Sequence, residues 1–120
     1  YRPDRIARPA PWAEQIGPND LWSDATDDPD YNQLVQTPYA PSHERLSRGD
    51  PLYDLILLTD WNWPCAEPGL GSAIFLHRWR KPGHPTEGCI AFSPTDFRWL
   101  VQHAKPGTRL IVPPLVGKLS

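Results

Sequence analysis

The sequence lacks methionine, any long apolar run, and all but two cysteines, Cys65 and Cys89. A helix that spans a bilayer needs about 20 consecutive apolar residues, so we expect no membrane span. Because the chain starts at Tyr1 and holds no methionine, we expect its natural N-terminus to lie outside these residues, so the absence of a signal peptide does not indicate localisation. Two cysteines permit one disulfide, which is too few for a disulfide-scaffolded domain.

The chain also lacks an excess of charge of either sign. Its formal net charge is -2, which gives no electrostatic reason to expect nucleic acid or an anionic membrane as a partner. A chain of 120 residues can build a single hydrophobic core but has no room for two. We therefore treat residues 1–120 as one domain, and no internal repeat divides them.

Proline and tryptophan are what the chain has in excess. Sixteen prolines cluster before Leu52 and between Trp63 and Pro85. Proline resists long helices and central strands, so we expect long ordered loops that rest on a small β core. Residues 1–51 are predicted to be the least regular part. The six tryptophans can anchor the loops, since an indole buries a large area and its N–H can bind a carbonyl.

Three segments read as strands and one as a helix. Residues 52–59 are nearly continuous in apolar side chains, which predicts a strand buried on both faces at the centre of the sheet. Residues 72–79 and 108–112 are predicted as two further strands. Ser93 offers an N-cap, with proline at the first helical position and an apolar stripe at helical spacing, and the helix is predicted to end at Lys105-Pro106-Gly107.

Two side chains in this chain are suited to nucleophilic chemistry, His77 and Cys89. His77 falls near the end of the 72–79 strand, on the same face as Phe75 and Trp79. Cys89 follows a loop rich in proline and glycine, which is long enough to reverse the chain and bring the thiol to the imidazole. A cysteine nucleophile needs a base and backbone donors for an oxyanion, and Gly88 lets a substrate approach the neighbouring N–H groups.

Other readings of these residues stay open. Cys89 can be a small buried core residue, which is the usual fate of a free cysteine, or it can form a disulfide with Cys65. Zinc bound by both cysteines with His77 and His84 lacks the paired ligand spacing of known zinc sites. The acidic stretch 20–31 offers carboxylates for calcium but not the alternation of a calcium loop, so a solvated turn is the default. We expect no metal and no cofactor.

The strings GSAIFLH and PTEGCIAFSPTDFRWL resemble the signature of the L,D-transpeptidase (YkuD-type) catalytic domain. In that family a strand ends in histidine, here His77. A downstream [ST]-x-G-C-[IV] motif, here residues 86–90, supplies the nucleophile. The resemblance extends from about Trp22 to Val112. It is greatest with a bacterial subgroup in which the strings YN, HERL, LYD and GSAIFLH recur in order.

The resemblance implies a mainly β, sandwich-like fold with one short α-helix, acting on peptidoglycan stem peptides in the periplasm or cell envelope. His77 would take the proton of Cys89, whose thioester would pass to an amine, giving a 3→3 cross-link, or to water. The orienting partner of His77 is expected to be a backbone carbonyl, with Ser72 or Asn62 as weaker candidates. The residues implied in catalysis are Cys89, His77 and Gly88, and those in substrate binding are Thr86, Glu87, Ser72, Asn62 and Tyr53.

The chain departs from the family pattern in two ways. The commoner motif has histidine before Gly-Cys and arginine near position 91, where this chain has Glu87 and Ala91, so altered substrate contacts are expected. The Gly-rich segment of the family's N-terminal strands is not found in this sequence, so we expect either that the chain is a fragment or that the sheet is completed differently. A missing edge would leave unpaired backbone that a strand from a second chain could fill. An L,D-carboxypeptidase or amidase on the same residues, or a non-catalytic peptidoglycan-binding module, remains the alternative function.

Overall fold

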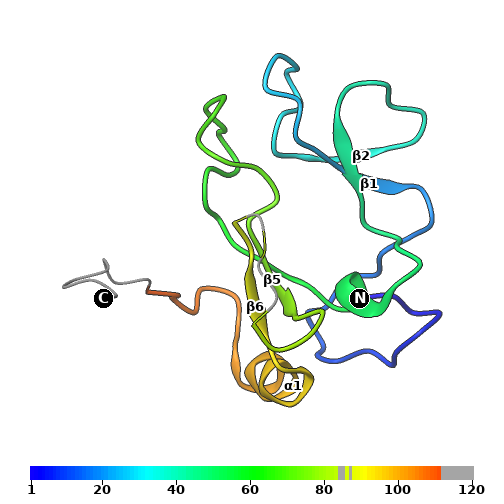
Figure 1. The fold of residues 1–120 in the computed structure, drawn as a ribbon, viewed down its shortest axis with the longest axis vertical. Helices are drawn as coiled ribbons and strands as arrows, with labels where there is room; N and C mark the ends of the chain where they lie inside the picture. Colours follow the sequence, from blue (N-terminus) through cyan, green and yellow to red (C-terminus); the bar gives the residue numbers. More distant parts are fainter. Residues whose placement is uncertain (84–85, 87, 112–120) are drawn as a thin grey trace.

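The computed structural model describes residues 1–83, 86 and 88–111 (Figure 1). Within these residues the chain is mainly short strands and ordered loops with one α-helix, so the predicted fold class is confirmed at that level. The elements in chain order are β1 (Asp20–Ser23), β2 (Leu34–Gln36), β3 (His43–Arg45), the 3-10 turn η1 (Pro51–Tyr53), β4 (Leu57–Leu58), β5 (Phe75–Arg78), β6 (Ile90–Phe92) and α1 (Pro94–His103).

The described strands form two small sheets. In the first, β1 lies between β2 and β3 and is antiparallel to both. In the second, β5 is central, antiparallel to β4 and parallel to β6. The first sheet lies within residues 1–51, which were predicted to be the least regular part. Its strands escape prediction because each is only three or four residues long and is flanked by turn formers.

Aromatic packing joins the two sheets. Phe75 of β5 is 1% exposed and meets Trp22 of β1 edge-to-face at 5.1 Å between ring centroids. On its other side Phe75 meets Tyr53 of η1 at 5.9 Å. Ile16, Leu46, Leu52 and Ala73 complete this core. In an edge-to-face pair the positive edge of one ring meets the negative face of the other, and the rings bury large areas. This cluster therefore fixes the sheets relative to each other.

Helix α1 covers the opposite face of β5. Alternation along the strand sends Phe75 and His77 to the aromatic core, and Leu76 to the other face, where it packs with Phe97 and Val101. The helix begins as predicted, because the Ser93 hydroxyl accepts a hydrogen bond from the N–H of Asp96 at 3.1 Å and proline follows at the first position. The described chain contains no helix with the length and apolar character needed to cross a membrane.

The predicted strand at residues 52–59 is wrong in extent and position. Pro51 fixes its own φ, and the Asp50 side chain accepts from the N–H of Leu52 at 3.1 Å, so the segment starts as the capped turn η1. Only Leu57 and Leu58 pair as strand β4, which lies beside β5 at the outside of its sheet. Leu58 is accordingly 56% exposed, and the buried central strand is β5.

Two other strand predictions also need correction. Strand β5 starts at Phe75 rather than Ser72, because Gly71 and Ala73 have left-handed backbones with φ of 115° and 57°. Residues 108–111 form no strand and are exposed to solvent, with no described strand beside them to pair with; residue 112 lies outside the described residues. The sandwich arrangement and exchange of strands between chains stay predictions.

Candidate active site

Strand pairing in the second sheet brings Cys89 and His77 to the same face. Strands β5 and β6 are parallel, with Leu76 opposite Ile90 and His77 opposite Ala91. Cys89 directly precedes β6, and alternation places its side chain with that of Ala91, toward the aromatic core. Strands lie about 4.8 Å apart and alternate residues about 6.6 Å apart, so Cys89 and His77 are diagonal neighbours with Cα atoms roughly 8 Å apart.

His77 is buried and held by the backbone. Its Nδ1 lies 2.6 Å from the carbonyl oxygen of Arg78, which can only accept, so Nδ1 carries a hydrogen and donates it. In the neutral ring Nε2 is then the basic nitrogen. This bond confirms the expected carbonyl partner. Ser72 and Asn62 do not take that role, since the Ser72 hydroxyl donates to the Ser23 carbonyl at 2.6 Å and Asn62 braces its own loop.

Cys89 is a half-buried free thiol at the edge of the aromatic core. Its Sγ donates to the carbonyl oxygen of Ala73 at 3.1 Å. Burial is the main reason that its pKa is raised, and the Glu44 carboxylate raises it further. Hydrogen bonds from the Phe75 N–H and the Tyr53 hydroxyl lower the pKa and partly offset these effects. The resting side chain is therefore a neutral thiol that needs a base to become a nucleophile.

The disulfide and zinc readings find no support among the described residues. Both cysteines are free, and Cys65 is exposed on the loop before β5. The described part of the chain holds no group of three or more histidine, cysteine or acidic side chains that could bind a metal ion, which includes the acidic stretch 20–31. His84, one of the zinc candidates, lies outside the described residues.

Gly88 makes the turn that leads into Cys89. Its φ of +96° lies in the left-handed region, and a Cβ there would lie 3.2 Å from the Cδ1 of Ile74. Thr86 braces the same turn, because its hydroxyl donates to the carbonyl oxygen of Cys89 at 2.6 Å. Backbone geometry thus explains why glycine occupies position 88 and threonine position 86. Glu87 lies outside the described residues.

Tyr53 connects the thiol to a pair of charged residues that the sequence did not single out as site residues. Its hydroxyl donates to Oε2 of Glu44 at 3.2 Å, and the guanidinium of Arg48 lies over its ring at 5.1 Å from the centroid. Burial, Glu44 and Cys89 all raise the pKa of Tyr53, so its hydroxyl keeps its hydrogen. The ring also packs edge-to-face on His77 at 5.5 Å. The only sequence signal for Glu44 is the HERL string.

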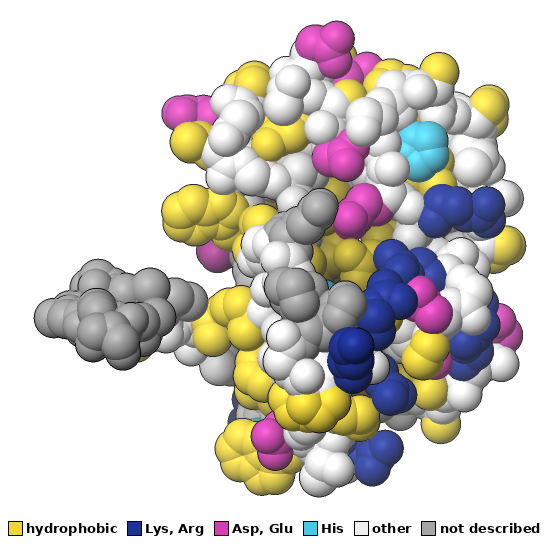
Figure 2. Space-filling view, viewed as in Figure 1, with side chains coloured by type: hydrophobic (Ala, Val, Ile, Leu, Met, Phe, Trp, Pro, Cys, Tyr) yellow, Lys and Arg dark blue, Asp and Glu magenta, His cyan; other side chains and the backbone are white. Residues whose placement is uncertain are grey.

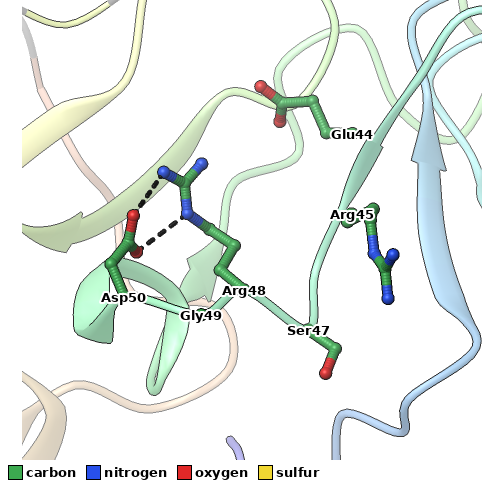
Figure 3. Close-up of a pocket in the computed structure, with 6 residues that line it drawn as sticks. All are labelled: Glu44, Arg45, Ser47, Arg48, Gly49 and Asp50. Carbon is green, nitrogen blue, oxygen red and sulfur yellow. Dashed lines mark hydrogen bonds and ion pairs between the residues drawn. The ribbon is translucent and has the colours of Figure 1, made fainter.

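Beside Tyr53 the charged segment 44–50 lines an open pocket of about 520 Å³ (Figure 3). Arg48 and Asp50 lie side by side in its lining, joined at 2.7 Å, and the hydrogen bond from Arg48 lowers the pKa of Asp50 to about 2. Figure 2 shows a hollow in the middle of one face, with hydrophobic side chains at its floor and Lys and Arg side chains along one side. The pocket beside Tyr53 is itself lined by charged and polar residues.

Comparison with known proteins identifies one family. The family model of the L,D-transpeptidase catalytic domain (YkuD) matches residues 1–112, a range that contains the whole site. No curated protein and no solved structure matches the chain. The family match confirms the resemblance to this family that was stated from the GSAIFLH and TEGC strings.

Proposed function

Because the chain belongs to the L,D-transpeptidase catalytic-domain family, whose domains act on the cell wall outside the cytoplasm, we propose that it is a cysteine acyltransferase of peptidoglycan stem peptides. It would act as a single catalytic domain in the periplasm or cell envelope. The observation that carries the proposal is the pairing of β5 with β6, which makes Cys89 and His77 diagonal neighbours on one face. Side chains on neighbouring strands of one face can bring imidazole and thiol together to exchange a proton once a substrate is bound.

The first half-reaction forms a thioester. Nε2 of His77 accepts the Sγ hydrogen of Cys89, and the thiolate attacks the carbonyl carbon at the L-centre of meso-diaminopimelate. The N–H groups of Gly88 and Cys89 donate to the oxyanion, a contribution of about 3 kcal/mol where the donors are well placed. The C–N bond to the terminal D-alanine then breaks, and the leaving amine takes the proton from the imidazolium.

The second half-reaction returns the free enzyme. An acceptor amine, deprotonated by His77, attacks the thioester carbon, and the C–S bond breaks to give a 3→3 cross-link and the thiol of Cys89. Water in place of the amine gives a shortened tripeptide.

The contacts around the thiol support this sequence of steps. The raised pKa of Cys89 requires a base, and the Arg78 carbonyl keeps the His77 ring oriented with Nε2 available. The Phe75 N–H supplies a hydrogen bond that favours the thiolate as it forms. The hydrogen of the Tyr53 hydroxyl is donated to Glu44. We propose Tyr53 and Glu87 as substrate contacts. Ser72, Asn62 and Thr86 are instead proposed as positioning residues, because their side chains bind backbone atoms.

The test is to analyse the products formed from purified sacculi and from disaccharide-tetrapeptides by liquid chromatography and mass spectrometry. We expect 3→3 dimers and free D-alanine with the parent, none with Cys89→Ala, and an unchanged profile with Cys65→Ala, which removes the exposed thiol. Tripeptides without dimers would assign a carboxypeptidase. Binding to sacculi with identical muropeptide profiles for the parent and Cys89→Ala would contradict the proposal and leave a binding module.

A further inference from the structure

The loop that leads into β5, residues 59–71, displays large apolar side chains to solvent. Trp61 is 58% exposed, Trp63 42% and Leu70 53%. Indoles normally bury most of their area, and exposed apolar patches mark interaction sites on soluble proteins. The proposed reaction does not use any of these three side chains.

Hydrogen bonds hold the exposed aromatic loop in one shape. The indole Nε1 of Trp61 donates to the carbonyl oxygen of Leu70 at 2.8 Å. The Asn62 amide donates to the carbonyls of Glu67 and Gly71, each at 3.0 Å, and its oxygen accepts from the N–H of Glu67 at 2.8 Å. A surface fixed before it meets a ligand loses little entropy on binding.

A buried residue of the turn between β1 and β2 anchors this loop to the core. The side chain of Asn32 is 2% exposed, and its amide nitrogen donates to the carbonyls of Trp61 and Asn62 at 3.3 and 2.5 Å. Its oxygen accepts from the Trp22 indole at 2.8 Å and from the N–H of Ala73 at 3.1 Å. The loop is thus tied to the same aromatic core that the thiol adjoins, and its exposed indoles do not result from a loose segment.

The aromatic loop and the nucleophile lie at the same end of the sheet. Since β5 and β6 are parallel, the segments that enter them meet at one edge, and Figure 1 shows the loop rising beyond the start of β5. Ile74 lies between the two segments. On one side, a Cβ added at Gly71 would lie 3.2 Å from Nε1 of Trp61 and 3.6 Å from Cδ1 of Ile74. On the other side, a Cβ added at Gly88 would lie 3.2 Å from the same Cδ1 atom. One side chain therefore separates Trp61 from the turn before Cys89.

The chemistry of this surface matches a sugar ring. A pyranose packs its axial C–H bonds on an indole face, and Asp60 and Glu67 add exposed carboxylates to the same loop that can accept hydrogen bonds from sugar hydroxyls. A protein partner would call for a contiguous apolar centre, whereas here tryptophan alternates with polar residues. Three residues of extended stem peptide span about 10 Å, a reach that puts the glycan beyond the Cys89 turn when the scissile bond is at the thiol.

We propose that Trp61, assisted by Trp63, stacks on a sugar of the glycan strand that carries the stem peptide, so that the enzyme grips the glycan and the peptide together. This inference rests on the proposed function for the position of the peptide. It concerns binding alone, so it can be tested without turnover.

The experiment is calorimetric titration of the Cys89→Ala protein with a peptide-free tetrasaccharide of alternating N-acetylglucosamine and N-acetylmuramic acid. We expect saturable binding, weakened at least about tenfold by Trp61→Ala, the scale of one lost aromatic stacking contact in other ligands. Trp61→Phe keeps a ring face but loses the bond to Leu70, and should retain most of the affinity. Trp99→Ala removes an equally exposed indole on α1 and should change nothing.

Several results would overturn the stacking proposal. The titration could show no saturable binding, or it could give equal affinities for Trp61→Ala and Trp99→Ala. Sedimentation could also show a dimer of the chain that Trp61→Ala abolishes. Trp63→Ala serves as a second variant if Trp61→Ala fails to fold, and an unweakened affinity there would count against the proposal as well. Glycan binding without muropeptide products would contradict the proposed function and leave this inference intact. Muropeptide products without glycan binding would contradict this inference and leave the proposed function intact.

Discussion

At the scale of single residues, the reactivity of Cys89 is set by neighbours that act in opposite directions. Burial and Glu44 raise the pKa of the thiol, while hydrogen bonds from the Phe75 N–H and the Tyr53 hydroxyl lower it. A carboxylate beside a nucleophile opposes formation of the thiolate. Burial, with a smaller contribution from Glu44, raises the pKa of Cys89, and the contribution of Glu44 can be tested by removing its charge.

Glu44→Gln should lower the pKa of Cys89, because it removes a negative charge while keeping an oxygen that the Tyr53 hydroxyl can bind. Alkylation of the thiol by iodoacetamide, measured against pH in the Cys65→Ala background, should then become faster below the pKa and its profile should move to lower pH. Glu67→Gln, on the exposed loop, is the matched control and should leave the profile in place. A profile that moves to higher pH, or does not move, would show that Glu44 does not raise the pKa of the thiol.

The sequence predicts part of this site and omits the rest for a physical reason. The motif and strand alternation are local, so they pointed to Gly88, Cys89 and His77. Glu44 and Arg48 reach the site only through the ring of Tyr53, a tertiary contact between segments that no periodicity connects.

At the scale of elements, the turn that enters β6 decides where the thiol lies. Gly88 holds a left-handed backbone with little room for a Cβ beside Ile74, and the Thr86 hydroxyl donates to the carbonyl of Cys89. Helix α1 was predictable because its signals, Ser93 and the proline after it, are local. The apolar run at 52–59 was predicted as a central strand, but Asp50 and Pro51 convert its start into a turn. Whether a strand lies at the centre or the edge of a sheet depends on its pairing partners, which the run itself does not reveal.

Gly88→Ala should destabilise the protein and impair the site. A left-handed backbone costs a residue with a Cβ about 1–2 kcal/mol, and here the added atom also presses on Ile74. Gly69→Ala has nearly the same φ, +88°, but meets nothing within 4 Å, so it carries the backbone cost alone. Urea unfolding should give a larger loss for Gly88→Ala than for Gly69→Ala, with turnover reduced only in the former. Equal losses would mean that the Ile74 contact has no energetic weight.

At the scale of the whole molecule, one aromatic cluster holds two small sheets together. Phe75 belongs to the second sheet, Trp22 to the first and Tyr53 to the turn between them. None of the described strands exceeds four residues, so neither sheet is expected to be stable without the other. The tryptophans and Phe75 were visible in the sequence, but the contact that joins the sheets depends on the whole fold.

Phe75→Ala should lower the free energy of unfolding by about 3–5 kcal/mol, because it leaves a cavity at the meeting point of both sheets. That is a large fraction of the roughly 5–15 kcal/mol typical of a domain. Phe75→Leu, which fills part of the volume, should lose less. Calorimetry should show one transition that shifts to lower temperature. Two separate transitions would indicate that the sheets unfold independently and that this cluster does not unite them.

The central claim, that Cys89 is an acyl-accepting nucleophile, is tested most directly by the mass of the protein after incubation with a carbapenem. The strained lactam carbonyl is an acyl donor, and the ring-opened product stays attached as a thioester. We expect one adduct of the full carbapenem mass, mapped to the peptide that contains Cys89. It should form in the parent and in Cys65→Ala and be absent from Cys89→Ala. A folded parent that remains unmodified, or an adduct on Cys65, would contradict the central claim.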